Sequence, residues 1–345
     1  IHLGDRIYAD RLMLEEVRLP DGRIWKNIVT PAKKEAAERL DQFRGNYSYN
    51  FLDEHYRRFS AEVPMLATWD DHEVMDNWWP GRRMTWKQQH RKGYRVKETE
   101  ILEKNGRQAF FEYTPMRRNT ADTDRIYRVV PCGPLADVFM LDGRSYRSPN
   151  DRNRETAPGK DAAMLGAAQV TWLKEALKQS KAVWKIIANP QPLAHVTKKP
   201  KPRYDQWANG DHGMPRGRER EAADILSFIK RENIRNTVWL AADVHYSAAY
   251  RFDPNQAAFQ DFNPFWEFIS GPFHTRPGQV KHFDKTFGPN QQYRTPVAPI
   301  INPPPSDGFL YFGHTNINAK TGAMRVTLRD LNDRTLFSVT LEPTG

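Results

Sequence analysis

The sequence predicts an α/β protein with a largely parallel sheet, followed by antiparallel strands near the C-terminal end. Short apolar runs alternate with segments of helical periodicity from residue 31 to residue 242, an order typical of strand–helix–strand units. Beyond residue 308, three strand-like segments follow one another, separated by turn sequences. We expect one domain over residues 1–345, with a long loop near the site at 253–308 and antiparallel strands at 309–345.

The expected elements follow one another along the chain. A helix is expected to begin at Pro31, because proline suits the first helical position. Further helices are expected at residues 52–60, 84–113 (long or broken), 166–179 and 219–233. Strands are expected at residues 63–69, 125–130, 137–142, 184–188 and 237–242, and in the tail at 309–313, 324–329 and 335–341.

Composition restricts the class of protein. The chain has 345 residues, 12% of them aromatic, so it can bury a sizeable core. It contains no run of about 20 apolar residues that could cross a membrane. The single Cys132 excludes an intrachain disulfide and is expected to be a small buried hydrophobe. A net charge of +10 favours anionic substrates, and no nucleic-acid-binding motif is found.

The chain begins at the end of an expected strand. Ile1-His2-Leu3 is apolar enough to be buried and leads directly into a polar motif. We therefore expect that residues are missing before Ile1, with any targeting peptide among them.

Three apolar runs end abruptly in a carboxylate and a second side chain that can bind metal. They are Gly4-Asp5-Arg6-Ile7-Tyr8, Thr68-Trp69-Asp70-Asp71-His72-Glu73 and Ala242-Asp243-Val244-His245. In α/β proteins, ligands bind beyond the carboxyl ends of the strands. Three such motifs predict a site for two metal ions, which can activate water for attack on phosphorus. The sequence therefore predicts a metal-dependent phosphoesterase.

The first motif supplies the expected bridging ligand. Asp5 stands at a strand tip and is expected to bridge both ions and to hold the metal-bridged hydroxide. Tyr8 can turn back to the same ion, where a phenolate would favour ferric iron; alternatively, its ring packs beside the core.

The second motif supplies a ligand and a proton donor. Either Asp71 or Asp70 is expected to bind the second ion, and the other carboxylate to order the loop. Oxygen ligands suit Ca²⁺, Mg²⁺ or Mn²⁺. His72 is expected to donate to the phosphate or to the leaving group, and Glu73 to orient it.

The remaining candidates lie further along the chain. Asp243 and His245 would share one face of an extended chain. Asn189, after the strand at 184–188, is either a metal ligand or a turn former. Arg144 and Arg147 could bind phosphate, or an arginine could pair with Asp142 and hold a loop. His274 is a candidate substrate contact, and Gly313-His314 competes with Asp243-x-His245 as the last metal motif; both histidines are more typical of loops.

Several motifs together resemble the PhoD family of alkaline phosphatases and phosphodiesterases. Besides those above, they are Leu141-Asp142-x-Arg144-x-Tyr146-Arg147, Gln169-x-x-Trp172-Leu173, Asn209-Gly210-Asp211 and Gly217-Arg218-Glu219. The family is distantly similar to purple acid phosphatases. The resemblance implies a four-layer α/β/β/α sandwich, hydrolysis of phosphomonoesters and diesters at alkaline pH, ferric iron with calcium, and export to the periplasm or the medium.

The resemblance also implies roles for single residues. Asp5 matches the bridging ligand, Tyr8 and His245 match iron ligands, and Asp243 matches a ligand of the second metal. Two features depart from the family pattern: a further iron ligand, commonly cysteine on an earlier strand, has no counterpart, and Asn189 stands where the superfamily has histidine. The alternatives are a phospholipase D-like phosphodiesterase, or a catalytically impaired basic binding protein.

Overall fold

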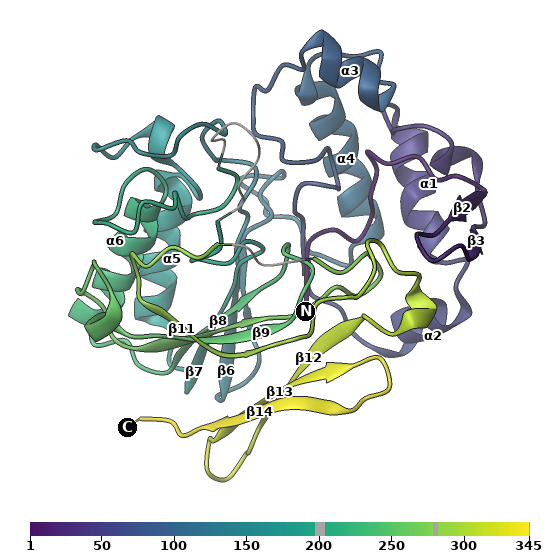
Figure 1. Cartoon of the computed structure of the whole chain (residues 1–345). Helices are drawn as coiled ribbons and strands as arrows, with labels where there is room; N and C mark the ends of the chain where they lie inside the picture. The colour runs from purple at the N-terminus through teal and green to yellow at the C-terminus, as the bar shows by residue number, and fades with distance from the viewer. Residues whose placement is uncertain (197–203, 279–281, 345) are drawn as a thin grey trace. The chain divides into compact units, whose positions relative to one another are not determined.

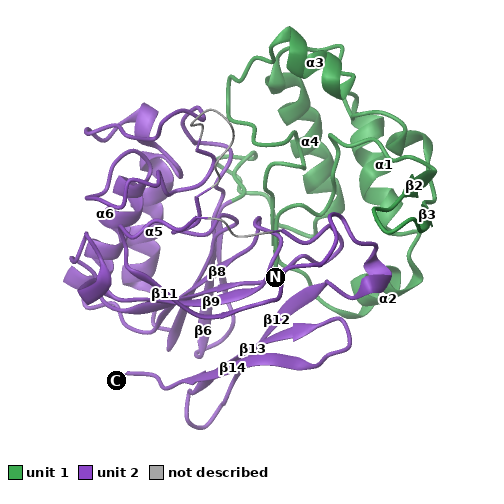
Figure 2. Cartoon of the chain, in the orientation of Figure 1, with its two compact units in different colours: residues 1–126 green, residues 127–345 purple. Residues whose placement is uncertain are grey.

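The computed structural model describes residues 1–196, 204–278 and 282–344. The chain forms two compact units, residues 1–126 (unit 1) and 127–345 (unit 2), shown in green and purple in Figure 2. The single domain expected from the sequence stays a prediction. None of the described helices is long and apolar enough to cross a membrane.

Unit 1 is mainly helical. Its helices are α1 (Leu40–Asn50), α2 (Glu54–Glu62), α3 (Trp86–Lys92) and α4 (Thr99–Tyr113). Two short strands, β1 (His2–Leu3) and β4 (Ala67–Thr68), pair in parallel, and β2 (Glu16–Arg18) and β3 (Ile24–Lys26) form an antiparallel hairpin. Both members of the parallel pair lead into predicted metal motifs.

The helix expected from Pro31 begins later than predicted. Residues Pro31–Lys33 form a single 3-10 turn, and α1 starts at Leu40. The side chain of Gln42 accepts hydrogen bonds from the backbone N–H groups of Glu38 and Arg39, both at 2.9 Å, and this cap fixes the start of α1. The segment at 84–113 is broken, because Gly93 ends α3 in the left-handed region at φ 75°.

Aromatic side chains build the core of unit 1. Trp69 packs edge-on against Trp78 at a centroid distance of 5.4 Å and lies 5.9 Å from Phe110 of α4. Helix α4 comes very close to the second metal motif: a Cβ on Gly106 would lie 2.5 Å from the carbonyl oxygen of Glu73. Glycine at position 106 therefore allows α4 to pack closely against the backbone of the second metal motif.

Unit 2 contains a seven-stranded sheet in the order β11-β9-β10-β8-β7-β6-β5. The strands are β5 (Arg128–Pro131), β6 (Ala136–Met140), β7 (Trp184–Ala188), β8 (Thr237–Ala241), β9 (Ala248–Phe252), β10 (Phe265–Ile269) and β11 (Pro289–Arg294). Strands β6, β7, β8 and β10 are parallel to one another, whereas β5, β9 and β11 run antiparallel to their neighbours. The parallel strands bring four carboxyl ends to one edge of the sheet.

Two helices, α5 (Ala167–Gln179) and α6 (Glu219–Arg231), pack on this sheet (Figure 1). Leu173 of α5 and Ile225 of α6 are fully buried in one cluster with Ile187 of β7 and Trp239 of β8. Register places Ile187 opposite Trp239, so both side chains lie on the helix-covered face. Burial of this amphipathic face is what makes the two helices stable here.

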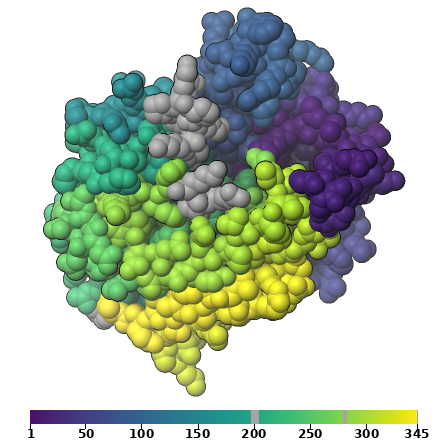
Figure 3. Space-filling view, in the orientation of Figure 1, coloured from purple at the N-terminus to yellow at the C-terminus, as the bar shows by residue number. Residues whose placement is uncertain are grey.

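The C-terminal segment forms a separate antiparallel sheet, as predicted. It consists of β12 (Tyr311–Ile317), β13 (Met324–Asp330) and β14 (Thr335–Leu341). Phe337 stacks on Tyr293 of β11 at 5.4 Å, and the indole N–H of Trp184 donates to the carbonyl of Gly322 at 2.7 Å. In Figure 3 this segment, in yellow, lies directly against green residues of the same unit. The α/β class with an antiparallel C-terminal segment is confirmed.

Two local predictions were wrong. Residues 253–308 are not one long loop, because they supply β10 and β11 of the large sheet; residues 279–281 lie outside the described part of the chain. Strand β10 reads Phe-Trp-Glu-Phe-Ile, which is nearly continuous in apolar residues because both of its faces are largely buried. Cys132 is exposed, not buried, because it lies in the connection between β5 and β6.

One carboxyl is buried within the large sheet. Glu267 of β10 is 1% exposed and accepts a hydrogen bond from the backbone N–H of Leu193 at 2.9 Å. Burial without a cation raises the pKa of Glu267 from 4.5 to about 8. Between these two values the folded chain holds a proton that the unfolded chain releases, so stability falls as the pH rises.

Glu267→Gln should remove this pH dependence. The amide keeps the acceptor for Leu193 and cannot ionise. Between pH 4.5 and 8, the free energy of unfolding of the native chain relative to this variant should fall by about 5 kcal/mol at most. Urea unfolding of both proteins across this range measures the difference, and parallel pH profiles would contradict the assignment.

Candidate metal centre

The first two motifs meet at the carboxyl ends of the parallel pair in unit 1. The residue after β1 is Gly4, with φ 91°, and a Cβ there would lie 2.3 Å from the Cβ of Asp70. Glycine therefore permits the two strand tips to touch. Asp5 follows in the left-handed region at φ 56°. Such a conformation is uncommon for a residue other than glycine and is characteristic of functional sites.

The fully buried Glu73 connects the motif at Asp5 to its own motif through hydrogen bonds to the backbone of both. Its carboxylate accepts hydrogen bonds from the backbone N–H groups of Asp5 at 3.0 Å, Arg6 at 2.7 Å and Asp70 at 2.9 Å. Burial raises the pKa of Glu73, and these three donors act in the opposite direction. The expectation that Glu73 orients His72 was wrong: it holds the backbone from which the candidate ligands project.

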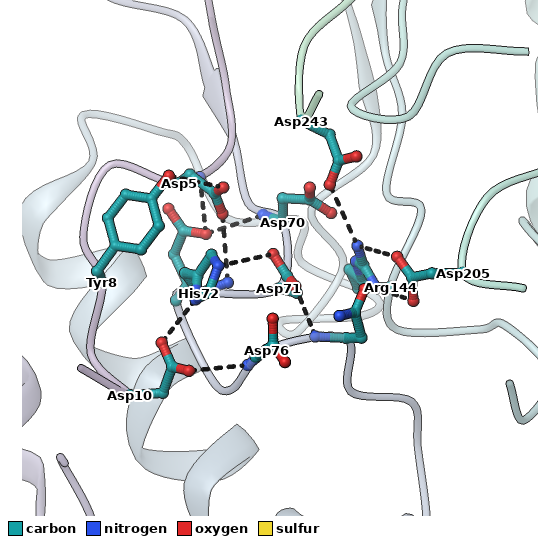
Figure 4. A network of polar contacts seen from close by, with 12 residues as sticks. Asp5, Tyr8, Asp10, Asp70, Asp71, His72, Asp76, Arg144, Asp205 and Asp243 are labelled. Carbon is teal, nitrogen blue, oxygen red and sulfur yellow. Dashed lines mark hydrogen bonds and ion pairs between the residues drawn. The ribbon is translucent and has the colours of Figure 1, made fainter. Parts of the chain in front are cut away.

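Asp5, Asp71 and His72 form a group that fits a metal ion. Each offers one ligand atom, and these atoms lie within 4.8 Å of one another. Asp71 and His72 are buried, which is unusual for ionisable groups. The hydroxyl of Tyr8 lies 3.3 Å from Oδ2 of Asp5 (Figure 4). Asp70, also buried, lies two residues after the end of β4. The oxygen-rich donor set suits a hard cation.

Tyr8 is held in place from several sides. Its ring lies 4.3 Å from the ring of His72, and the N–H of Ala9 donates to the carbonyl of His72 at 3.0 Å. The buried ammonium of Lys33 donates to the carbonyl of Tyr8 at 3.1 Å. The alternative that Tyr8 only packs beside the core does not explain why its hydroxyl is directed to Asp5.

Asp10 orients His72, and sequence reasoning missed it. Oδ1 of Asp10 lies 2.6 Å from Nδ1 of His72, which leaves Nε2 4.0 Å from Oδ1 of Asp71 (Figure 4). Lys92 at the end of α3 pairs with Oδ2 of Asp10 at 2.7 Å. Burial alone would lower the pKa of His72, but the charges of Asp10 and Asp71 outweigh it and raise the pKa to about 9. The sequence indicated this role only through the position of Asp10, two residues after the candidate ligand Tyr8.

The sheet edge of unit 2 carries the remaining candidates. Asn189 follows β7 and is fully buried; its Nδ2 donates to the carbonyl of Gln191. Its Oδ1 has no hydrogen-bond partner in the described part of the chain. A buried amide oxygen without a donor is costly. This orphaned oxygen favours the ligand reading of Asn189 over the turn-forming one.

Asp243 and His245 do not lie on an extended strand, so the argument from alternation was wrong. β8 ends at Ala241, and both residues are in the left-handed region at φ 59°. Asp243 accepts a hydrogen bond from Nε2 of Gln206 at 2.5 Å and lies 3.8 Å from Nη2 of Arg144. Strain at both positions of one short turn is typical of a functional site.

Arg144 and Arg147 both pair with Asp205, a residue that the sequence did not single out. Arg144 binds Asp205 through two hydrogen bonds of 3.0 and 2.9 Å, and Arg147 lies 3.4 Å from the same carboxylate. Asp142 instead accepts from the backbone N–H groups of Arg144 and Ser145, both at 3.0 Å. Burial would raise the pKa of Asp205, but the two arginines hold it well below its usual range. A phosphate would have to compete with Asp205 for either guanidinium.

The two remaining candidate histidines, His274 and His314, are exposed. His274 follows β10 and lies 6.4 Å edge-on from Phe273, and His314 lies within β12 opposite Thr327. Neither belongs to a group of metal-binding side chains in the described residues. The role of His274 as a substrate contact stays a prediction.

Comparisons with known proteins identify the family of the chain. A family model described as PhoD-like phosphatase matches residues 1–328. Alkaline phosphatase D of Bacillus subtilis (strain 168) is 29% identical over 263 residues, covering 72% of this chain and 41% of that protein. A solved structure of PhoD matches with a TM-score of 0.59 and 21% identity, covering 99% of this chain and 66% of that one. The chain thus spans about two fifths of the length of this curated relative. Because the family model covers nearly all of its residues, the chain belongs to the PhoD-like phosphatase family.

Proposed function

We propose that this protein is a metal-dependent hydrolase of phosphate esters, acting on monoesters and diesters. The observation that carries the proposal is the approach of Asp5 and Asp71, whose carboxylate oxygens lie within 4.8 Å of each other and of the ring of His72. The curated relative is named an alkaline phosphatase, and its name supports the same reaction class. The positive net charge of +10 favours anionic substrates.

We assign the ligands from the resemblance and from the order of the motifs. Asp5 would bind both ions, Tyr8 would bind ferric iron, and either Asp71 or Asp70 would bind a calcium ion or another hard divalent ion. The resemblance also assigns Asp243 and His245 as ligands and implies export, and Asn189 is a further candidate ligand because its buried Oδ1 has no hydrogen-bond partner among the described residues. Bound metal would supply an activated water and neutralise negative charge on the phosphoryl group.

The side chains of the chain itself would position and protonate the substrate. Asp10 fixes the ring of His72 through Nδ1, so Nε2 is the nitrogen that can donate to the leaving group. Glu73 binds the backbone N–H groups of both Asp5 and Asp70, and so holds the two motifs next to each other. This rigid support is what a preorganised site requires.

Metal removal tests the proposal. Exhaustive chelation should abolish hydrolysis of chromogenic phosphomonoesters and diesters, and Ca²⁺ with ferric iron should restore it. Elemental analysis before and after chelation shows whether activity follows metal content. Full activity in metal-free protein would overturn the proposal, as would a metal-loaded protein that hydrolyses neither ester.

Tyr8→Phe tests the iron ligand. If the phenolate binds ferric iron, the iron-loaded protein should show a visible charge-transfer absorption, and the variant should lack it. The ring contact with His72 needs only the aromatic face, so Phe should preserve the packing. A native protein that contains stoichiometric iron and is colourless would remove Tyr8 from the ligand set and leave Asp5 in it.

A further inference from the structure

Arg11 places a positive charge one aromatic ring away from the candidate metal centre. Its guanidinium lies over the ring of Tyr8, with Cζ 5.2 Å from the ring centroid. The same ring lies 4.3 Å from His72, and its hydroxyl lies 3.3 Å from Asp5. Arg11 follows the motif directly, but neither the family motifs nor the ligand assignments include it.

The backbone around Arg11 is fixed. The N–H of Arg11 donates to the carbonyl of Tyr8 at 3.3 Å, and the N–H of Met13 donates to the carbonyl of Lys33 at 2.7 Å. These two hydrogen bonds connect the segment around Arg11 to Tyr8 and to the 3-10 turn that ends at Lys33. A long, flexible side chain on a fixed backbone can move from the ring face to its hydroxyl edge without rearranging the loop.

Arg11 is half-buried, and its guanidinium makes no ion pair with the residues that the structure describes. Among the described residues, no carboxylate pairs with it and no side-chain acceptor takes its N–H groups. The neighbouring cations differ in this respect: Lys92 pairs with Asp10 at 2.7 Å, and Lys33 donates to Asn46 at 2.7 Å. Burial chiefly lowers the pKa of Lys33 to about 8, and the charge of Arg11 adds to this effect. A partly buried cation without a paired carboxylate can accept an anionic ligand.

We propose that Arg11 binds the phosphoryl group of a phosphomonoester and thereby makes monoesters better substrates than diesters. This inference rests on the proposed function. A monoester at alkaline pH carries two negative charges and three terminal oxygens, whereas a diester carries one charge and two such oxygens. A guanidinium beside the metals can take the additional oxygen, and its planar fork suits a phosphate better than an ammonium does.

The test compares Arg11→Gln and Arg11→Lys with the native protein on a nitrophenyl monoester and its matched diester. Arg11→Gln should lower kcat/KM for the monoester by about 10- to 100-fold, mainly through KM, and for the diester by less than about threefold. Arg11→Lys should recover part of the loss. Inorganic phosphate binding, measured by calorimetry on the metal-loaded protein, should weaken by a similar factor in Arg11→Gln.

Arg18→Ala is the matched control, because Arg18 is an exposed arginine of β2 in the same excursion. It should change neither the ratio of the two esters nor phosphate affinity. Equal losses on both esters in Arg11→Gln, with lower metal content or thermal stability, would overturn the proposal and make Arg11 a structural support of Tyr8. An unchanged ester ratio and phosphate affinity would also overturn it. If the native protein neither hydrolyses esters nor binds phosphate, the proposed function fails instead.

Discussion

Replacing Asp5 by Asn should remove metal from the protein and lower its phosphatase activity by about a thousandfold or more. A bridging carboxylate supplies charge to both ions, and a neutral amide of the same shape cannot. Asparagine is among the few residues that tolerate the left-handed region, so the φ of 56° at this position should survive the change. The backbone N–H of residue 5 can still donate to Glu73.

The fold should therefore be intact in Asp5→Asn, which makes the loss interpretable. Elemental analysis and monoester turnover measure the two effects, and circular dichroism verifies the fold. Asp21→Asn is the matched control: Asp21 is an aspartate in the β2–β3 turn that pairs with Arg23, and its replacement should leave metal content and rate unchanged. An Asp5→Asn protein with full metal content and full rate would exclude Asp5 as the bridge.

The strand-end motifs could be predicted because the candidate ligands stand next to the strands that position them in the sequence. A buried apolar run that stops at a carboxylate is visible in the sequence, and parallel strands bring such ends to one edge. Strand β7 was predicted with its exact bounds, and β8 to within one residue. By contrast, β10 lacks alternation because both of its faces are buried, and sequence reasoning assigned it to a loop.

The residues that support the site could not be predicted in the same way. Asp10 reaches His72 across 62 positions of sequence, and Asp205 reaches Arg144 across 61. Asp10 has one local indication, its position two residues after Tyr8, and Asp205 has none. Their partners are fixed only when the loops are folded, so the pairing is tertiary information. The wrong role for Glu73 has the same origin, because its acceptors serve backbone groups and not the adjacent side chain.

His72→Ala should keep its metal and lose about 10²- to 10⁴-fold in rate, the usual contribution of a positioned acid or base. The geometry motivates this separation from Asp5: Nδ1 of His72 is held by Asp10 at 2.6 Å, and only Nε2 remains for the substrate. Asp10→Asn should give a smaller loss in rate, because the ring stays but its orientation and charge balance change. Metal content by elemental analysis and turnover of a monoester separate the two variants from Asp5→Asn.

The leaving group then identifies what His72 does. A nitrophenyl oxygen departs without a proton, whereas an alkyl oxygen would carry a poorly stabilised charge. If His72 donates to the leaving group, His72→Ala should therefore lose much more on alkyl esters than on nitrophenyl esters. Equal losses on both would place His72 on the phosphoryl oxygens. Loss of metal in His72→Ala would instead make Nε2 a ligand, which the 4.0 Å separation from Asp71 also permits, with Asp10 then acting as the carboxylate that orients a metal-bound histidine.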